Sequence, residues 1–304
     1  MTSGEATVVL NAGSHYLLAH LPEWDVFPAV LRGRLRLKSA GITNPVAVGD
    51  RVRYEDDTIV EVLPRRNYVI RRSTNLSRQA HIIAANVDMA YIVVSQYFPE
   101  VKLPFLDSIL VTCAVYGIPV TIVVSKTDMY RDVAPEAIAA FRSIYEGAGY
   151  PVLETSVLTG EGISSLREAC SGRVNLFSGE SGVGKSSLIK ALDPTLDPKI
   201  GEISEAHLQG KHTTSLYQMY PLASGGYVID SPGIRGFGLV DLEKEEIYKY
   251  FPEMLRASAG CRFTPCTHTH EPGCAVKAAV DSGEISAERY NSYLGMLEED
   301  RKFR

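Results

Sequence analysis

The chain has 304 residues, of which 45% are hydrophobic and 22% charged, and its formal net charge is −5. This composition is typical of a folded soluble protein with room for two or three domains, and it excludes a disordered or fibrous chain. No apolar stretch approaches the roughly 20 residues that cross a bilayer, and the first residues lack a basic segment followed by an apolar one. We therefore expect a cytoplasmic protein with no membrane partner.

Residues 1–72 are expected to form a small β-barrel of the OB type. Short runs rich in β-branched and aromatic residues alternate there with turn residues. The runs predict strands at 7–10, 15–21, 27–37, 50–54, 58–63 and 68–70. Five or so short strands in such a short segment favour a barrel.

Two basic runs in this region favour binding of nucleic acid. The first run alternates, so a strand would place its cations on one face: Arg32, Arg34, Arg36 and Lys38. The second run, residues 62–87, has no acidic side chain, and Tyr68 is interleaved with its arginines as a candidate stacking ring. Its cations are Arg65, Arg66, Arg71, Arg72 and Arg78. The alternative is an ordinary solvated strand face followed by an arginine-rich linker.

A phosphate-binding loop follows a predicted strand at 173–178. The segment from 179 to 186 satisfies G-x-x-x-x-G-K-[S/T] and precedes a predicted helix at 187–192. Its residues, with the serine after them, are Gly179, Glu180, Ser181, Gly182, Val183, Gly184, Lys185, Ser186 and Ser187. The backbone N–H groups of such a loop surround phosphates, its lysine reaches the outer phosphates, and its serine binds Mg²⁺.

Two motifs before this loop resemble the guanine-binding loops of GTPases. The strand predicted at 119–125 ends in Ser125-Lys126-Thr127-Asp128, which resembles [N/T]-K-x-D. In that motif the aspartate accepts hydrogen bonds from guanine N1–H and from the exocyclic amine. The strand predicted at 151–154 leads into Thr155-Ser156-Val157. This segment resembles the second guanine loop, in which a backbone N–H meets guanine O6.

Two further motifs follow the phosphate loop. Lys211-His212-Thr213-Thr214 resembles a first switch, in which either threonine can bind Mg²⁺ and the γ-phosphate. A predicted hairpin, with strands at 213–222 and 227–230, then ends in the D-x-x-G motif of Asp230 and Gly233. Asp230 is expected to hold Mg²⁺ through water, and the Gly233 N–H to contact the γ-phosphate.

The order of these motifs predicts a circularly permuted GTPase domain. In an ordinary GTPase the phosphate loop, the switch threonine and D-x-x-G precede the two guanine loops, whereas here the guanine loops come first. Predicted helices at 104–116, 135–147 and 164–170 alternate with the strands, which indicates a largely parallel sheet. Because the pocket is assembled in space, a permuted chain can still build it.

The five cysteines favour a metal site over a disulfide framework, because their number is odd and three lie between residues 261 and 274. Cys261-x₄-Cys266-x-His268-x₅-Cys274 is a Cys3His zinc set in which protein fills all four positions. His270 is the rival imidazole. We expect one Zn²⁺ per chain with a structural role.

The end of the chain predicts a helix, capped at Ser286, whose apolar positions continue at helical spacing to Leu297. Cys113 and Cys170 lie outside the metal set and are expected to be core thiols.

The barrel, the permuted GTPase motifs and the Cys3His set together resemble the family of ribosome small-subunit-dependent GTPase A, known as RsgA, across nearly the whole chain. The resemblance implies hydrolysis of GTP to GDP and phosphate with Mg²⁺, stimulated by the 30S ribosomal subunit during its late maturation. It also implies contacts with 16S rRNA by a monomer. It divides the chain into a barrel (1–72), a permuted GTPase domain (73–245) and a zinc-binding domain with a C-terminal helix (246–304).

The resemblance also implies roles for single residues. Ser125 departs from the usual asparagine, and the shorter serine is expected to lose contacts to guanine and to the phosphate loop. Ile234 stands where many GTPases have a water-orienting glutamine, and the resemblance assigns that role to His212. The catalytic set is then His212, Lys185 and Thr214. The implied Mg²⁺ ligands are Ser186 and Thr214.

Two other functions fit some of these features. A P-loop phosphotransferase would need an acceptor pocket, and the guanine and D-x-x-G motifs argue against it. An RNA-binding assembly protein that uses its nucleotide site only for binding would show no stimulated hydrolysis.

Overall fold

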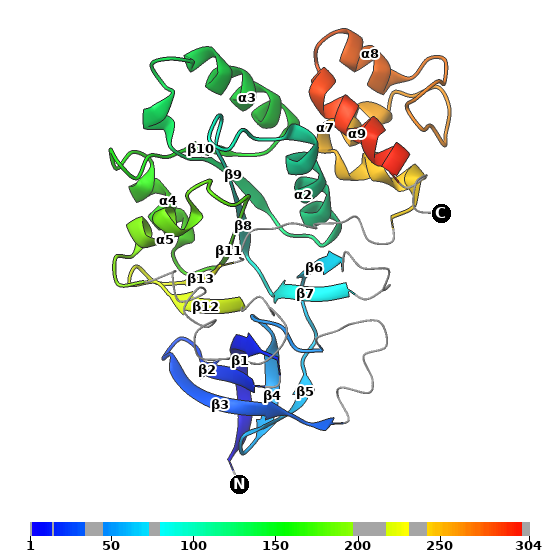
Figure 1. The fold of residues 1–304 in the computed structure, drawn as a ribbon. Helices are drawn as coiled ribbons and strands as arrows, with labels where there is room; N and C mark the ends of the chain where they lie inside the picture. Colours follow the sequence, from blue (N-terminus) through cyan, green and yellow to red (C-terminus); the bar gives the residue numbers. More distant parts are fainter. Residues whose placement is uncertain are drawn as a thin grey trace.

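A computed structural model describes residues 2–13, 15–33, 45–72, 80–196, 217–230 and 242–299 (Figure 1). Within these ranges the chain forms a β-barrel, an α/β unit and a C-terminal helical unit. Figure 1 shows the barrel at one end of the molecule and the helical unit at the other, beside α2 and α3.

The predicted barrel is confirmed and has five strands. They are β1 (Ser3–Ala12), β2 (His15–His20), β3 (Asp25–Leu31), β4 (Arg51–Glu55) and β5 (Thr58–Val62). They pair in the order β1-β2-β3-β5-β4, and the pairing of β1 with β4 closes the barrel. Side chains alternate along the strands, so that Val8, Leu18, Val52 and Ile59 fill the interior.

The strand predicted at 27–37 is shorter than expected: β3 ends at Leu31. Its neighbour β2 begins at His15, opposite Val30, so β3 has no β2 partner beyond this point. Arg32 lies just after the strand, and Arg34, Arg36 and Lys38 lie outside the described residues. Of the four cations expected on one strand face, the described residues therefore include only Arg32, which lies outside β3.

A hairpin follows the barrel, in the segment for which the sequence also allowed an arginine-rich linker. Strand β6 (Tyr68–Arg72) pairs antiparallel with β7 (Ala80–Ala85), a strand that the sequence pattern did not predict. Val69 and Ala84 from this hairpin are buried in the same core as the sheet of the α/β unit. Tyr68 packs against Tyr116 with ring centroids 4.8 Å apart, so its ring is not a free stacking platform.

The α/β unit has the parallel sheet that the sequence predicted. Its strands are β8 (Met89–Val94), β9 (Val120–Val124), β10 (Val152–Glu154), β11 (Val174–Ser178), β12 (Tyr217–Pro221) and β13 (Tyr227–Asp230). They lie in the order β10-β9-β8-β11-β13-β12, with only β12 antiparallel to its neighbour in this unit. The carboxyl ends of the parallel strands therefore share one edge, where ligands of open α/β sheets bind.

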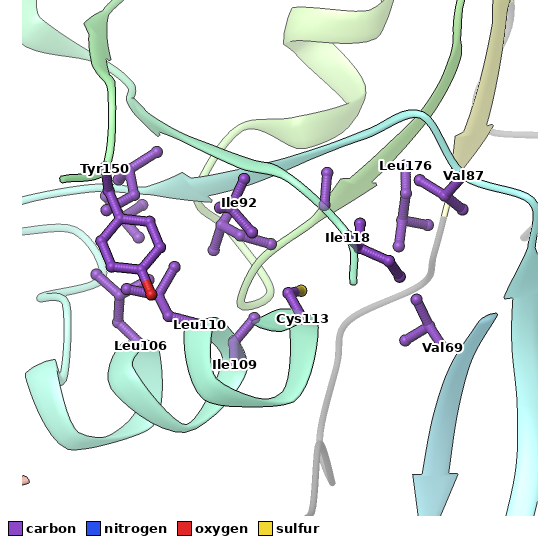
Figure 2. Close-up of a cluster of buried hydrophobic side chains, with 14 of the residues drawn as sticks. Val69, Val87, Ile92, Leu106, Ile109, Leu110, Cys113, Ile118, Tyr150 and Leu176 are labelled. Atoms are coloured by element: carbon purple, nitrogen blue, oxygen red, sulfur yellow. The ribbon is translucent and has the colours of Figure 1, made fainter. Parts of the chain in front are cut away.

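Helices cover both faces of this sheet. They are α2 (Leu103–Val115), α3 (Pro135–Ala148), α4 (Ile163–Cys170) and α5 (Lys185–Leu192), with the short 3₁₀ turn η1 (Thr127–Met129) after β9. Figure 2 shows α2 presenting Leu106, Ile109 and Leu110 to the sheet. Cys113 of α2 and Cys170 of α4 are core thiols as expected, and burial raises the pKa of each to about 12.

The barrel and the α/β unit form one continuous sheet. Strand β1 pairs antiparallel with β12 through Leu10 with Gln218 and Asn11 with Tyr217. Val9 and Ala19 of the barrel belong to the same buried cluster as the residues under α2. The barrel is therefore packed against the α/β unit rather than tethered to it.

The C-terminal unit is helical around a second core. Its elements are the 3₁₀ helix η2 (Lys244–Tyr250), α7 (Pro252–Ser258), α8 (Ala275–Asp281) and α9 (Ala287–Glu299). The core contains Phe251, Met254 and Tyr293, together with Val111 from α2. Across the described ranges, no helix combines the length and the apolar character needed to span a bilayer.

Candidate functional site

The phosphate loop runs from the end of β11 to the start of α5, as the sequence predicted. Gly179 has a φ of +153°, and a Cβ atom there would lie 2.2 Å from the Val93 carbonyl oxygen. Only glycine fits this position, because the loop passes directly over strand β8. Gly184, with a φ of +98°, forms the N-cap of α5 and turns the chain into the helix. The loop thus places the N-terminus of α5 at the ligand-binding edge of the sheet.

Lys185 lies inside this loop and is only 8% exposed. Its Nζ donates to the carbonyl oxygens of Gly179, at 2.6 Å, and Glu180, at 3.0 Å. Burial lowers the pKa of Lys185, and the carboxylates of Asp230 and Glu180 oppose that shift. These hydrogen bonds therefore hold the Lys185 ammonium group against the backbone of the phosphate loop.

Asp230 ends strand β13 beside the phosphate loop. Its Oδ1 is buried and has no hydrogen-bond partner among the described residues. Burial raises the pKa of Asp230, and the charge of Lys185 lowers it. An orphaned carboxylate oxygen at this position suits a hard cation with oxygen ligands such as Mg²⁺, because the cation would supply the missing partner.

The first guanine motif is bonded directly to the phosphate loop. Ser125 Oγ donates to the Val183 carbonyl oxygen at 2.6 Å, so the expected loss of this link does not occur. Lys126, with a φ of +58°, crosses the loop, and its Nζ donates to the carbonyl oxygens of Gly182 and Phe98 at 2.6 and 2.7 Å. Two segments more than fifty residues apart are therefore bonded to each other at this edge of the sheet.

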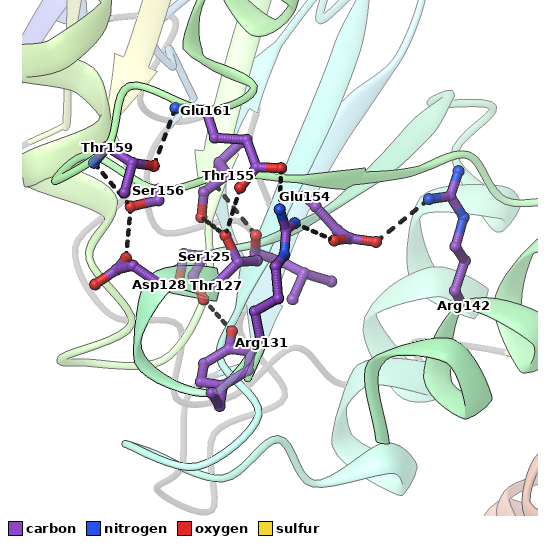
Figure 3. Close-up of polar contacts among 12 residues, drawn as sticks. Ser125, Thr127, Asp128, Arg131, Arg142, Glu154, Thr155, Ser156, Thr159 and Glu161 are labelled. Carbon is purple, nitrogen blue, oxygen red and sulfur yellow. Dashed lines mark hydrogen bonds and ion pairs between the residues drawn. The ribbon is translucent and has the colours of Figure 1, made fainter. Parts of the chain in front are cut away.

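The second guanine loop lies against the first (Figure 3). Ser156 Oγ donates to Asp128 Oδ1 at 2.5 Å and accepts a hydrogen bond from the Thr159 N–H at 3.2 Å. Asp128 is exposed, so its carboxylate is open to a ligand. The Ser156 N–H already donates to the Glu161 carbonyl oxygen at 3.0 Å. A backbone donor to guanine O6 would therefore come from another residue of this loop.

Several predicted site residues lie outside the described ranges. They are His212, Thr213, Thr214 and Gly233. Ser181, Ser186 and Ser187 are described and exposed, on the phosphate loop and at the start of α5. The structure thus brings together the phosphate loop, both guanine motifs and Asp230.

The four predicted metal ligands form one cluster. Ligand atoms of Cys261, Cys266, His268 and Cys274 all lie within 4.8 Å of one another. His268 Nδ1 lies 3.6 Å from Cys261 Sγ and 3.4 Å from Cys274 Sγ, and these two sulfurs are 4.0 Å apart. A tetrahedral zinc ion would separate neighbouring sulfur and nitrogen ligands by about 3.6–3.8 Å. The spacing and the donor set therefore fit zinc.

The surroundings of this cluster hold its backbone in place. Tyr290 and Tyr293 of α9 donate their hydroxyl hydrogens to the carbonyl oxygens of His268, at 2.6 Å, and Thr267, at 2.7 Å. Burial lowers the pKa of His268, which favours the neutral imidazole that binds metals. The rival imidazole, His270, is exposed, and its Nδ1 pairs with Thr269 Oγ1 at 2.9 Å. The structure thus selects His268 for the cluster.

A buried ion network joins the C-terminal unit to the α/β unit, and the sequence pattern did not indicate it. Arg289 of α9 is 1% exposed. Its guanidinium donates to Asp107 of α2 at 2.7 Å and to Glu253 of α7 at 2.7 Å, and it lies 4.6 Å from the Phe251 ring centroid. A buried cation with two carboxylates fixes the angle between the units, because neither partner can leave without stranding a charge.

The described barrel arginines are already paired with acidic side chains. The pairs are Arg32 with Glu55, Arg51 with Glu5, Arg53 with Glu61, and Arg65 with Asp50. The first three pairs are about half exposed and contribute little to stability, so they can rearrange on an anionic surface. Arg65 is held more firmly, because the Asp50 side chain is fully buried.

The sheet order, the phosphate loop after β11 and the guanine motifs that precede it define a circularly permuted P-loop GTPase. The family model for the RsgA GTPase matches residues 62–240, which is more than half of the chain. The chain belongs to the RsgA GTPase family.

Relatives and solved structures are similar over almost the full length. The chain is 46% identical to the small ribosomal subunit biogenesis GTPase RsgA of Bacteroides fragilis, over 98% of each chain. It is 43% identical to the protein of the same name from Porphyromonas gingivalis, over 97% of each. The crystal structure of YjeQ from Thermotoga maritima aligns with a TM-score of 0.79 and 32% identity, over 98% of each chain. The structure of YloQ, described as a circularly permuted GTPase, aligns with a TM-score of 0.72 and 26% identity, over 100% of this chain and 96% of that one.

Proposed function

We propose that this protein hydrolyses GTP to GDP and phosphate, that the small ribosomal subunit stimulates it, and that it acts in late maturation of that subunit in the cytoplasm. The observation that carries the proposal is the bonding of Ser125 and Lys126 to the phosphate loop, which holds the guanine motif beside the phosphate motif. Relatives that are 43–46% identical over nearly their whole length bear the name small ribosomal subunit biogenesis GTPase.

The residues of the pocket then have separate roles. The N–H groups of the phosphate loop and the N-terminus of α5 surround the phosphates, and Lys185 turns its charge to the β- and γ-phosphates. Ser186 would bind Mg²⁺ directly, and Asp230 would hold it through water. When bound, Mg²⁺ neutralises charge on the β- and γ-phosphate oxygens. Asp128 selects guanine.

Hydrolysis also needs residues outside the described ranges. We assign Thr213 or Thr214 to Mg²⁺ and the γ-phosphate, Gly233 to the γ-phosphate, and His212 to the attacking water. These roles rest on the motif order and on the family resemblance. Ile234 has an alkyl side chain, so it cannot orient water as a glutamine would.

The two flanking units are proposed to dock on 16S rRNA. The barrel carries the half-exposed arginines, and the C-terminal unit carries the cluster proposed to hold one Zn²⁺. We place the units at 1–72, 73–245 and 246–304, although the β6–β7 hairpin crosses residue 72. We propose that the protein acts as a monomer, because hydrogen bonds within the chain hold the phosphate loop and both guanine motifs together.

The test is to measure GTP hydrolysis with and without purified subunits. Small subunits are expected to raise turnover by orders of magnitude, as ordering of switch residues by a partner does in other GTPases, whereas large subunits should not. Stimulation should fall with added salt, because phosphate contacts release counterions. Equal binding of the small subunit with GDP and with a GTP analogue, without stimulated hydrolysis, would favour an RNA-binding protein that uses its nucleotide only as a ligand.

A further inference from the structure

One glutamate joins the two guanine loops (Figure 3). Glu161 belongs to the second loop, and its carboxylate reaches the first loop on both sides of Asp128. Its Oε1 accepts from Arg131 Nη1 at 2.5 Å, and its Oε2 lies 3.3 Å from the Thr127 hydroxyl, which can donate to it. Residues 127 and 131 thus bracket the carboxylate that is proposed to read guanine.

Arg131 holds a second carboxylate at the same time. Its Nη2 donates at 2.7 Å to Glu154, the last residue of β10, which also accepts from Arg142 of α3 at 3.3 Å. Hydrogen bonds to Glu161 and Glu154 raise the pKa of Arg131, with Glu161 the larger cause. The arginine therefore links the first guanine loop to the end of β10 and to the second guanine loop.

Backbone hydrogen bonds join Glu161 to Ser156 within the second loop, so a displacement of Glu161 would also displace Ser156. The Glu161 carbonyl accepts the Ser156 N–H at 3.0 Å, and the Ser156 carbonyl accepts the Gly160 N–H at 3.0 Å. Gly162 has a φ of +69°, and a Cβ atom there would lie 2.1 Å from the Glu154 carbonyl oxygen. Only glycine fits at this position, because the loop backbone lies directly against the end of β10.

We infer that Glu161 and Arg131 are positioning residues for guanine selectivity, because together they fix the distance between Ser156 and Asp128. This inference rests on the proposed function. Ser156 holds one oxygen of Asp128, and the carboxylate must meet N1–H and the exocyclic amine of guanine in one plane. A displacement of about 1 Å breaks such hydrogen bonds, so the groups that hold the carboxylate decide how much the amine contributes to binding.

The exposure of the pair argues for a role in selectivity rather than in folding. The side chains of Arg131 and Glu161 are 44% and 38% exposed. Ion pairs in such positions contribute little to the free energy of unfolding. Neither side chain reaches the phosphate loop by any contact in the described residues, so their loss should leave phosphate binding intact.

The experiment compares GDP with inosine diphosphate, whose base lacks only the exocyclic amine. The measured quantity is the ratio of the two dissociation constants, inosine diphosphate over GDP, for the full chain with Mg²⁺. Glu161→Ala and Arg131→Ala are each expected to lower this ratio by about threefold to tenfold, which is only part of the value of a hydrogen bond to a charged group, because Asp128 is displaced rather than removed. Glu161→Gln should lie between wild type and Glu161→Ala, because the amide oxygen still accepts from Arg131.

Glu146→Ala is the matched control. Glu146 pairs with Arg142 at 2.9 Å, so its loss removes a glutamate–arginine pair from the same network without touching either guanine loop. The control should keep the wild-type ratio, and the thermal midpoints of all variants should stay close to that of wild type.

Three results would count against the inference. An unchanged ratio in both Glu161→Ala and Arg131→Ala would overturn it while leaving the guanine site in place. An equal fall in affinity for both nucleotides would show a general structural role and overturn it too. A wild-type ratio near one would instead contradict the proposed guanine site, and the inference with it.

Discussion

Trp24 of the barrel stacks on Tyr227 of β13, with ring centroids 5.6 Å apart and ring planes inclined by 24°. Tyr227 begins the strand that ends at Asp230, and β12, the partner of β13, pairs with β1 of the barrel. The β12–β13 hairpin is therefore attached to the barrel by strand pairing and by an aromatic contact. If the hairpin moves when the bound nucleotide changes, the barrel would move with it.

Removing the ring of Tyr227 should expose Trp24. The chain has one tryptophan, so tryptophan emission reports the surroundings of Trp24. Tyr227→Ala is expected to shift the emission to longer wavelength and to lower the free energy of unfolding by about 1 kcal/mol, since an aromatic pair contributes about that much beyond its buried area. Tyr97→Ala serves as the control, because Tyr97 packs on Tyr130 rather than on Trp24. An emission maximum that does not move in Tyr227→Ala would show that the stack is not formed in solution.

Loss of Arg289 should be far more damaging than loss of a surface arginine. Asp107 and Glu253 would remain buried without their cation, and breaking a buried pair in this way costs about 3–5 kcal/mol. We expect Arg289→Ala to lower the free energy of unfolding by that amount in chemical denaturation.

Two further variants sharpen this prediction. Arg289→Lys should recover little of the stability, because one ammonium group cannot place two nitrogens on two carboxylates. Arg142→Ala, at a half-exposed arginine, should change stability by less than about 1 kcal/mol. Equal effects of Arg289→Ala and Arg142→Ala would mean that the buried network is not a joint between the units.

Zinc content should distinguish His268 from His270. His268→Ala removes one of four ligands from the cluster, whereas His270→Ala removes an exposed imidazole outside it. Elemental analysis of the wild type should find one zinc per chain. His270→Ala should keep it, and His268→Ala, or Cys266→Ala with Cys274→Ala, should lose it along with stability of the C-terminal unit. Full zinc occupancy in His268→Ala would exclude His268 as a ligand.

The motifs could be predicted from the sequence because each is a short segment that carries its own backbone chemistry. The phosphate loop needs glycines at fixed spacing, and strands that end in parallel at one edge bring Asp128 and Ser156 together. The metal set was equally local. Each motif depends on residues close in the chain, and the parallel sheet then brings the motifs together.

The misses depend on partners that the local sequence pattern does not specify. Arg289 shares a helix face with Tyr293, and only the carboxylates of α2 and α7 explain its burial. Strand β7 pairs with β6, whereas the sequence pattern indicates only an arginine-rich run there. The end of β3 at Leu31 follows from where β2 begins. Glu161 stands in a polar loop, and no spacing rule connects it with Arg131.

The substitution Asp128→Asn should move base preference from guanine to xanthine. The new amide can keep its oxygen on the Ser156 hydroxyl, which in the wild type donates to Asp128 Oδ1 at 2.5 Å. The amide nitrogen would then face the base as a donor. Guanine presents an amine there and would be repelled, whereas xanthine presents a carbonyl oxygen and can accept.

The affinity for GDP is therefore expected to fall by about a hundredfold or more, because the amide N–H and the guanine amine would both be donors and could not pair. Xanthosine diphosphate should gain affinity in the same competition assay. Lys185→Ala provides the contrast, because loss of a phosphate contact should weaken both nucleotides alike and leave their ratio unchanged. If Asp128→Asn retained its preference for GDP, Asp128 would not contact the base, and the edge of guanine would have to be read by another residue of the two loops.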